Sequence, residues 1–314
     1  MPECDFSVVT ASVYLPMESL SAGQLLGGTY TGSMYGSGVA LVPGKLGKAL
    51  YVGYQQEDGF VDLGEIRGNC FGEPHLCQQG YTLMMWIHRP VVQPPNHYYF
   101  CNGGQASSSY GISIHGHLDY LGFQLKTKTK WYKFSAQVST NVWHHIGFTW
   151  SEQMGLLVYV DGERVLGPSD VVLNSRPSTT YNNFFIGKPN NVGNYYGTAI
   201  LDEVLFWEEL KDPDFFKTVY DSYSDPLKLH FVSASNFRVR YDTAFDTAAV
   251  TEIVKCAPVP VDSVRVHPCR LTCMWLLWCG AAVYDGKECL YYNVYYTEGT
   301  LTHHAEGSTM FVKM

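Results

Sequence analysis

Three lysines at alternate positions are the first residues whose type and spacing suggest ligand binding. In a β-strand, Lys126, Lys128 and Lys130 would share one face, with their ammonium groups about 7 Å apart. Such a row can receive sulfated or carboxylated glycans, because anionic oxygens accept charge-assisted hydrogen bonds. The alternative is a solvated face that protects a strand from edge pairing, a role in which lysine is common.

A second candidate is the polar and aromatic segment 189–196. Carboxamide groups match sugar hydroxyls as donors and acceptors, and tyrosine rings can stack on the apolar faces of sugars. An ordinary turn rich in asparagine and glycine has the same composition and stays open as the alternative. The glycan-binding candidates in this segment are Asn190, Asn191, Asn194, Tyr195 and Tyr196.

Carboxylates for catalysis are poorly placed. Glycoside hydrolysis requires two carboxylates about 5 Å apart, or farther apart for inversion, that face one groove. Asp202 and Glu203 are neighbours, so a strand would point them to opposite faces, and neither has an alternating partner. The sequence also lacks a nucleophile elbow and a phosphate-binding glycine loop. We therefore expect no catalytic residues and no enzyme.

Histidines occur in pairs that are weak metal-binding patterns. The neighbours at 144–145 and at 303–304 would lie on opposite sides of a strand, whereas His115 and His117 could share a face. A pair without a carboxylate or thiolate partner is weak evidence for a metal ion. We expect hydrated surface histidines and assign no metal ligands.

The elements that must position these side chains are mainly strands. Alternating apolar residues predict strands over 142–150 and 156–160 in a hairpin, followed by a tight turn at Asp161-Gly162. Farther along, Asp212 can cap a helix that begins at Pro213. Its apolar face would comprise Phe215, Phe216, Val219 and Tyr220.

Composition predicts a globular, β-rich protein. The chain has 314 residues, of which 46% are hydrophobic and 16% charged, with 23 tyrosines. This length allows about two domains. A net charge of -8 argues against a nucleic-acid partner, and no stretch approaches the roughly 20 apolar residues of a membrane span. The first residues lack the basic and apolar pattern of a secretory signal.

Nine cysteines are unevenly distributed, with five of them between 256 and 289. Such crowding predicts a small disulfide-stapled domain, while a zinc site, the alternative, lacks a closely spaced second pair. Cys70 and Cys77 bracket a short loop and are expected to bond to each other. Cys4, Cys101 and Cys256 form an odd set, in which Cys4 is the candidate for an intermolecular disulfide.

Several segments resemble the concanavalin A-like and laminin-G-like (pentraxin-like) jelly-roll family. The main ones are GKLGKAL at 44–50, WHHIGFTW at 143–150 and LLVYVDG at 156–162. The segments 14–17, 61–64, 81–87, 184–187 and 199–207 follow the order of strands in that family. The resemblance implies an antiparallel jelly-roll β-sandwich with one short C-terminal helix over residues 1–224.

After a linker at 225–239, residues 240–314 resemble the PAN/apple family. In that family a short helix bearing two cysteines is stapled to strands, which implies a small disulfide-rich α+β domain. The implied pairs are Cys273 with Cys279 and Cys269 with Cys289. The sequence departs from the pattern because no cysteine after Cys289 joins the ends of the domain.

The jelly-roll resemblance also raises the question of calcium. Pentraxins hold calcium in an acidic cluster after the strand that corresponds here to 184–187, but this chain continues with Lys188 and Pro189. Hard cations require several oxygen ligands, so pentraxin-type binding is not expected. A single calcium ion held by Asp or Asn side chains and loop carbonyls, as in some laminin-G-like domains, stays open without assigned residues.

Together these patterns predict a secreted, non-catalytic recognition or adhesion protein that binds extracellular glycans or proteins. A structural subunit of an extracellular assembly, self-associating through Cys4, is the alternative from another class. A glycoside hydrolase is the third hypothesis and lacks its carboxylate pattern.

Overall fold

The computed structural model describes residues 11–223 except 27, 54–57, 104–108, 168, 174–182 and 191–194, together with nine strands outside that range. The chain divides into two compact units, Ser12–Asp221 and a second composed of Met1–Ala11 with Ser222–Met314. The sequence-based boundary at 224 stays a prediction.

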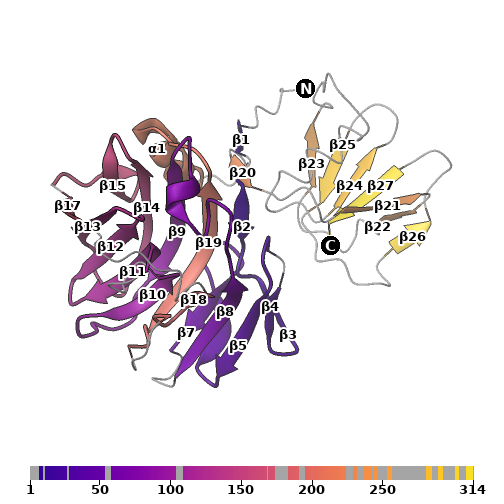
Figure 1. The fold of residues 1–314 in the computed structure, drawn as a ribbon. Coiled ribbons are helices and arrows are strands. Elements are labelled where there is room, and N and C mark those ends of the chain that lie inside the picture. Colours follow the sequence, from indigo (N-terminus) through magenta and orange to yellow (C-terminus); the bar gives the residue numbers. More distant parts are fainter. Residues whose placement is uncertain are drawn as a thin grey trace. The chain divides into compact units, whose positions relative to one another are not determined.

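The unit Ser12–Asp221 is a sandwich of two antiparallel sheets (Figure 1). In spatial order, the ten-stranded sheet contains β17 (Asp170–Leu173), β13 (Lys130–Gln137), β12 (Tyr120–Lys126), β11 (Gly111–His117), β10 (His97–Cys101), β18 (Asn183–Ile186), β8 (Gly59–Glu65), β5 (Gly32–Gly36), β4 (Gln24–Leu26) and β3 (Ser19–Ser21). The eight-stranded sheet contains β16 (Glu163–Arg164), β15 (Gly155–Val160), β14 (Trp143–Ser151), β9 (Tyr81–His88), β19 (Ala199–Trp207), β7 (Lys48–Val52) and β6 (Val39–Pro43), and β2 (Val13–Leu15) pairs with β19.

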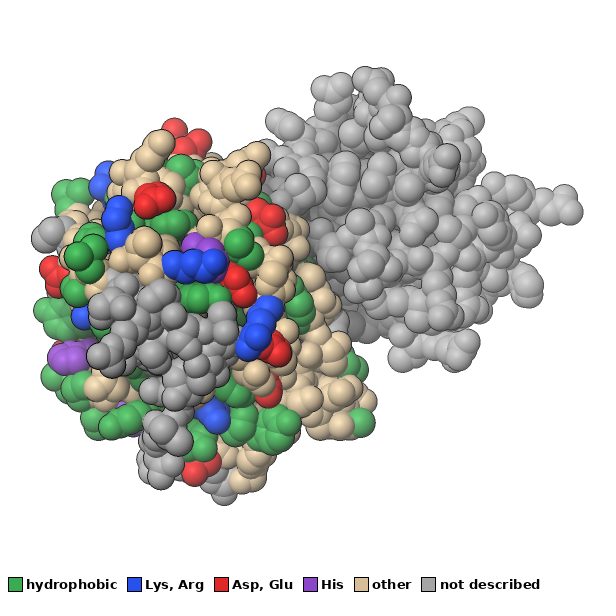
Figure 2. All heavy atoms as spheres, in the orientation of Figure 1, with side chains coloured by type: hydrophobic (Ala, Val, Ile, Leu, Met, Phe, Trp, Pro, Cys, Tyr) green, Lys and Arg blue, Asp and Glu red, His purple; other side chains and the backbone are tan. Residues whose placement is uncertain are grey.

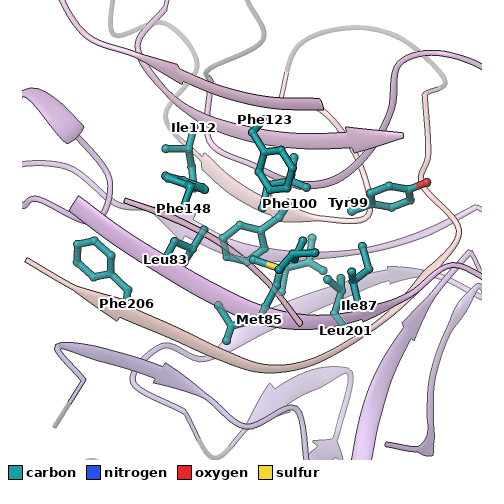
Figure 3. Close-up of a cluster of buried hydrophobic side chains, with 14 of the residues drawn as sticks. Leu83, Met85, Ile87, Tyr99, Phe100, Ile112, Phe123, Phe148, Leu201 and Phe206 are labelled. Atoms are coloured by element: carbon teal, nitrogen blue, oxygen red, sulfur yellow. The ribbon is translucent and has the colours of Figure 1, made fainter. Parts of the chain in front are cut away.

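The core lies between the two sheets and is built from alternate apolar residues of their strands. Figure 3 shows Leu83, Met85 and Phe148 of the eight-stranded sheet facing Phe100 and Phe123 of the other, all buried. Removing this much aromatic and aliphatic surface from water drives folding of the unit. The predicted hairpin is confirmed, since β14 pairs with β15 and Asp161-Gly162 turns the chain into β16.

The predicted helix is also confirmed, as α1 (Pro213–Ser222). Asp212 caps it, because its carboxylate accepts a hydrogen bond from the Phe215 amide at 2.8 Å. The helix covers the outer face of the eight-stranded sheet, where the Phe216 ring stacks on Tyr159 with centroids 3.7 Å apart. Gly147 permits this approach, because a Cβ atom there would lie 2.8 Å from the Phe216 ring.

The second unit contributes nine described strands. A five-stranded antiparallel sheet has the order β21 (Phe237–Tyr241), β27 (Thr309–Lys313), β24 (Ala281–Tyr284), β25 (Cys289–Tyr292) and β23 (Ile253–Cys256). Two further pairs are β1 (Ser7–Val9) with β20 (Leu229–Phe231), and β22 (Thr243–Phe245) with β26 (Leu301–His303). The segment expected to form the helix with two cysteines lies outside the described residues, as do Cys269, Cys273, Cys279 and Cys4.

Among the described residues, no helix has the length and apolar character needed to cross a membrane. On the face of Ser12–Asp221 shown in Figure 2, basic and acidic side chains lie close to one another. A ligand site is therefore better sought in local geometry than in the overall charge.

Candidate ligand-binding face

The lysine row expected from the sequence does not exist as one strand. Strand β12 ends at Lys126, β13 begins at Lys130, and Lys126 pairs in register with Trp131. Residues 127–129 form the connecting turn, in which the Thr127 hydroxyl accepts a hydrogen bond from the Lys130 amide at 3.0 Å. This local side-chain bond competes with strand pairing, so the alternation of lysine and threonine was misleading.

The three lysines consequently have different surroundings. Lys126 is 1% exposed on the outer face of the ten-stranded sheet. Lys128 is exposed in the turn and lines a cavity at the end of the sandwich. Lys130 forms an ion pair with Glu152 at 3.7 Å. Of the three, Lys126 contributes to the outer face of the ten-stranded sheet, where the other polar side chains gather.

A row of mainly polar residues crosses the outer face of the ten-stranded sheet. The strand register places Lys133, Gln124, Ser113, Cys101, Phe185 and Asp62 side by side on consecutive strands from β13 to β8. Their neighbours along each strand belong to the core, so these side chains take the opposite face. With strands about 4.8 Å apart, the row is about 24 Å long. We call it the polar row.

Several polar atoms in and beside the polar row are buried without a hydrogen-bond partner among the residues that the structure describes. They are Ser113 Oγ, His115 Nδ1, Gln124 Oε1 and Trp131 Nε1, on three adjacent strands. Buried polar groups normally have partners, because leaving one unsatisfied costs about 1–3 kcal/mol. A cluster of such atoms is therefore a candidate ligand site.

His115 is held in place by a glycine on the neighbouring strand. His115 and Gly122 are register partners, and a Cβ atom on Gly122 would lie 2.3 Å from the imidazole ring. The ring also packs 5.3 Å from the Tyr98 ring. Burial, with a smaller contribution from His117, lowers the pKa of His115 to about 4, so the ring is neutral at pH 7.

Two ammonium groups converge on one indole ring at the β13 end of the face. Lys126 Nζ lies 4.2 Å and Lys133 Nζ 3.8 Å from the centroid of Trp131. Burial and the charge of Lys133 lower the pKa of Lys126 to about 8. An anionic group bound beside this indole would stabilise both charges.

The opposite end of the face is aromatic. Tyr35 stacks on Phe60 with ring centroids 4.9 Å apart, and Tyr196 lies 6.2 Å from Phe60. Lys188 Nζ lies 4.3 Å from the Phe60 centroid and 4.6 Å from that of Phe185. Burial lowers the pKa of Lys188, although Asp62 opposes this effect. Tyr35 is 48% exposed and thus accessible to a ligand.

The predicted loop residues are partly placed by the structure. Tyr196 joins the aromatic end, whereas Tyr195 is exposed beside His97, with ring centroids 6.4 Å apart. Asn190 donates a hydrogen bond to the carbonyl of Asn183 at 3.2 Å, so its amide supports β18. Asn191 and Asn194 lie outside the described residues.

The expectation of hydrated surface histidines is wrong for two of them. His145 is 2% exposed, and burial lowers its pKa to about 3. His115 is also buried. His144 bonds through Nδ1 to Asp161 at 2.7 Å and through Nε2 to Ser139 at 2.8 Å. Burial raises the pKa of Asp161, but hydrogen bonds from His144 and His145 outweigh this effect and lower it overall.

Asp202 and Glu203 are both fully buried in β19. Glu203 accepts hydrogen bonds from the Tyr14 hydroxyl at 2.9 and 3.0 Å, and Asp202 accepts them from the Lys45 and Leu46 amides at 2.8 and 3.1 Å. Burial and the neighbouring Glu203 raise the pKa of Asp202 to about 9. These carboxylates anchor a loop and a strand.

Cys70 and Cys77 form a disulfide, and Cys101 is a buried thiol. Within the described ranges, no group of three or more His, Cys, Asp or Glu residues could hold a metal ion. A calcium site therefore stays unassigned.

Comparison with known proteins agrees with this architecture. Residues 64–214 match the Laminin_G_3 family, described as the concanavalin A-like lectin/glucanases superfamily, and form a concanavalin A-like domain. The chain is 26% identical over 219 residues to human adhesion G-protein coupled receptor D1, covering 66% of this chain and 23% of the receptor. The bovine receptor is 22% identical over 184 residues, covering 58% of this chain and 20% of the receptor.

The chain thus spans about a fifth to a quarter of the length of these relatives. Among solved structures, domain 4 of the arabinanase AbnA from Geobacillus stearothermophilus, in complex with arabinotriose, has a TM-score of 0.47 at 15% identity, covering 67% of this chain and 98% of that domain. The binding domain of botulinum neurotoxin serotype D/C has a TM-score of 0.49 at 13% identity, covering 75% of this chain and 58% of that chain.

Sequence reasoning missed most of the residues that make this face. Ser113, His115 and Gln124 alternate with apolar residues, and that alternation is a readable signal for one strand face. Trp131 and Lys133 show the same alternation after the turn. Which of these side chains lose water and lack partners depends on how the strands pair.

Proposed function

We propose that this chain is an extracellular, non-catalytic recognition protein that binds an anionic glycan across the outer face of its ten-stranded sheet. The observation that carries the proposal is the convergence of Lys126 and Lys133 on Trp131, next to polar atoms without partners. The concanavalin A-like domain and the likeness to adhesion receptors support non-catalytic binding outside the cell.

The positive charges of Lys126 and Lys133 favour an anionic ligand. Two neighbouring ammonium groups repel each other, and within the described part of the chain no carboxylate forms an ion pair with Lys133. A carboxylate or sulfate bound between them would remove that repulsion and make charge-assisted hydrogen bonds. The site is therefore suited to an acidic sugar.

The polar row suits a polyhydroxylated chain. The hydroxyl and the carboxamide on the row, and the imidazole of His115 beside it, can each donate or accept, as sugar hydroxyls do. The aromatic end adds an exposed ring, Tyr35, on which a sugar could stack. A row about 24 Å long can contact several consecutive sugars.

Hydrolysis receives no support from Asp202 and Glu203. Asp202 and Glu203 are buried and hydrogen-bonded within β19, and neither lies on the polar row. The alternative of a structural subunit depends on Cys4 and on the second unit. A ligand-independent disulfide-linked assembly would favour it.

For the second unit, we propose a PAN/apple-like domain with a secreted location. The five-stranded antiparallel sheet and the crowding of cysteines between 256 and 289 support this assignment. Peptide mapping under non-reducing conditions tests it directly. The expected pairs are Cys269 with Cys289 and Cys273 with Cys279, and intact thiols at these four positions would contradict the proposal.

The glycan proposal is tested by affinity for immobilised heparin and for a matched neutral polysaccharide. Lys133→Met is expected to weaken heparin binding about tenfold, a change of about 1.4 kcal/mol, since it removes one charged contact. The control is Lys48→Met, which removes an exposed lysine from β7 of the other sheet. If heparin retained Lys133→Met as strongly as Lys48→Met, the proposal of an anionic site would be refuted.

A further inference from the structure

A separate cavity of about 630 Å³ lies at one end of the sandwich, within the size range of small-ligand sites. Three segments meet around it: residues 77–79, the β12–β13 turn at 127–129, and residues 151–153 at the end of β14 and in the turn that follows. None of its lining residues belongs to the polar row. The cavity can therefore be studied independently of the proposed anionic site.

Uncharged hydrogen-bonding groups dominate the lining. Nine of the twelve lining residues have polar side chains, among them three glutamines, Gln78, Gln79 and Gln153. None of these three carboxamides bonds to the part of the chain that the structure describes. Each offers two donors and an acceptor.

Formal charges around the cavity balance. The lining has one lysine, Lys128, and one glutamate, Glu152. Burial, together with Lys128, lowers the pKa of His75, so this ring is neutral at pH 7. A strongly anionic ligand would find no excess of positive charge in this cavity.

Two lining residues carry buried nitrogen atoms that make no hydrogen bond to the described part of the chain. Trp150 is 4% exposed, and its Nε1 donor has no partner. His75 Nδ1 also lacks one, and its Nε2 is 3.6 Å from Glu73, too far for a hydrogen bond. Both nitrogens require a partner that the described chain does not supply.

The walls of the cavity are held in place by a disulfide and by hydrogen bonds within the chain. Cys77 lines the cavity and is tied to Cys70 by the disulfide. Gln79 accepts a backbone hydrogen bond from Leu210 at 3.1 Å, and Thr127 closes its turn on Lys130. A preformed site loses little conformational entropy on binding.

We infer that this end cavity is a second ligand site, which binds an uncharged, hydroxyl-rich oligosaccharide. Sugar hydroxyls both donate and accept, as the carboxamide and hydroxyl lining requires. A peptide ligand would be expected to insert apolar side chains into a mainly apolar pocket, whereas only Cys77, Trp150 and Leu210 are apolar among the lining residues.

The test is binding of the full chain to an array of short uncharged oligosaccharides, with titration calorimetry on the best binder. The double variant Gln78→Ala, Gln153→Ala is expected to weaken binding about tenfold without changing the melting temperature, because both side chains are exposed. The matched control is Gln24→Ala, an exposed glutamine on β4 outside the cavity. Lys133→Met is expected to leave this binding unchanged.

A second measurement uses the tethered wall. Reduction of the Cys70–Cys77 disulfide is expected to weaken neutral-sugar binding while the sandwich stays folded. The inference is overturned if neither the double variant nor reduction weakens neutral-sugar binding. It is also overturned if no uncharged oligosaccharide binds. Peptide binding that the double variant abolishes also overturns it, in favour of a peptide site. If Lys133→Met lost heparin binding and no uncharged oligosaccharide bound the wild type, the cavity proposal would be refuted and the proposal of the anionic site would stand.

Discussion

On the eight-stranded sheet, several outward polar groups form hydrogen bonds within the chain, and α1 packs on the face. Thr82 bonds to Thr149 at 2.9 Å and to the Glu209 carbonyl at 2.7 Å, while Glu203 is held by Tyr14. On the ten-stranded sheet, Ser113 and Gln124 keep unpartnered atoms on the polar row. The first arrangement contributes to stability, and the second costs stability that a ligand can recover.

The eight-stranded sheet also has buried polar atoms that lack a hydrogen-bond partner among the described residues, and they are as inaccessible to solvent as those of the ten-stranded sheet. Asp202 Oδ1 lacks a hydrogen-bond partner among the described residues, while Oδ2 of the same carboxyl group is covered by the Lys45 and Leu46 amides. A missing partner therefore does not identify a site by itself. On the ten-stranded sheet, the additional evidence is the pair of ammonium groups on Trp131.

The largest effect is expected from removing the packing of α1 on the eight-stranded sheet. Phe216→Ala removes a fully buried ring that stacks on Tyr159, and we expect a loss of about 3–5 kcal/mol in the free energy of unfolding. Chemical denaturation measures it. Asp214→Ala, an exposed change on the same helix, is the control. A loss below about 1 kcal/mol would show that α1 does not hold this face.

The second-largest effect is expected from removing the hydrogen bond between Tyr14 and Glu203. Tyr14→Phe removes a hydroxyl that donates a hydrogen bond to Glu203, and we expect a destabilisation of about 1.5–3 kcal/mol because a buried charged acceptor loses a donor. Chemical denaturation measures this loss, and heparin binding should stay at the wild-type level. The comparison between faces would fail if this variant kept full stability but lost ligand binding.

Acid should weaken the fold through buried neutral histidines on both faces. The pKa of His115 is about 4 and that of His145 about 3, below the value of about 6.5 in the unfolded chain. The unfolded state therefore binds more protons, and the stability present above pH 6.5 is lost as the pH falls toward 4. Melting temperatures of wild type and His115→Gln, measured from pH 7 to 4.5, should converge at the acidic end. Parallel curves would contradict the assigned burial.

A smaller effect is expected from the pH dependence of ligand binding. The pKa of Lys126 is about 8, so its charge is present at pH 7 and largely lost at pH 9. Heparin affinity should fall over this range by more in wild type than in Lys126→Met. An identical decline in both proteins would show that Lys126 does not contact the ligand.

The smallest effect on stability is expected on the polar row. Ser113→Ala removes a buried hydroxyl that has no partner, so the free energy of unfolding should change by less than about 0.5 kcal/mol or rise. Glycan binding should weaken several-fold at the same time. Denaturation and calorimetry on one preparation separate the two readouts, and a strong destabilisation would mean that Ser113 supports the sheet.

Local patterns in the sequence were sufficient for several elements. The hairpin of β14 and β15 followed from alternating apolar residues, and α1 from its cap at Asp212 and its apolar face. In contrast, alternation alone could not reveal that residues 127–129 turn the chain, because threonine and lysine also suit a strand. The Thr127 hydrogen bond and the pairing of Lys126 with Trp131 decided it.

The sequence by itself determined the hairpin of β14 and β15, the helix α1 and the loop closed by Cys70 and Cys77, because these depend on residue periodicity and on neighbours a few positions apart. Only the tertiary structure decided that His115 and Lys126 are buried and that Trp131 gathers two ammonium groups. Loss of water and convergence of charges depend on which strands lie side by side. That arrangement is set by contacts between residues far apart in the chain.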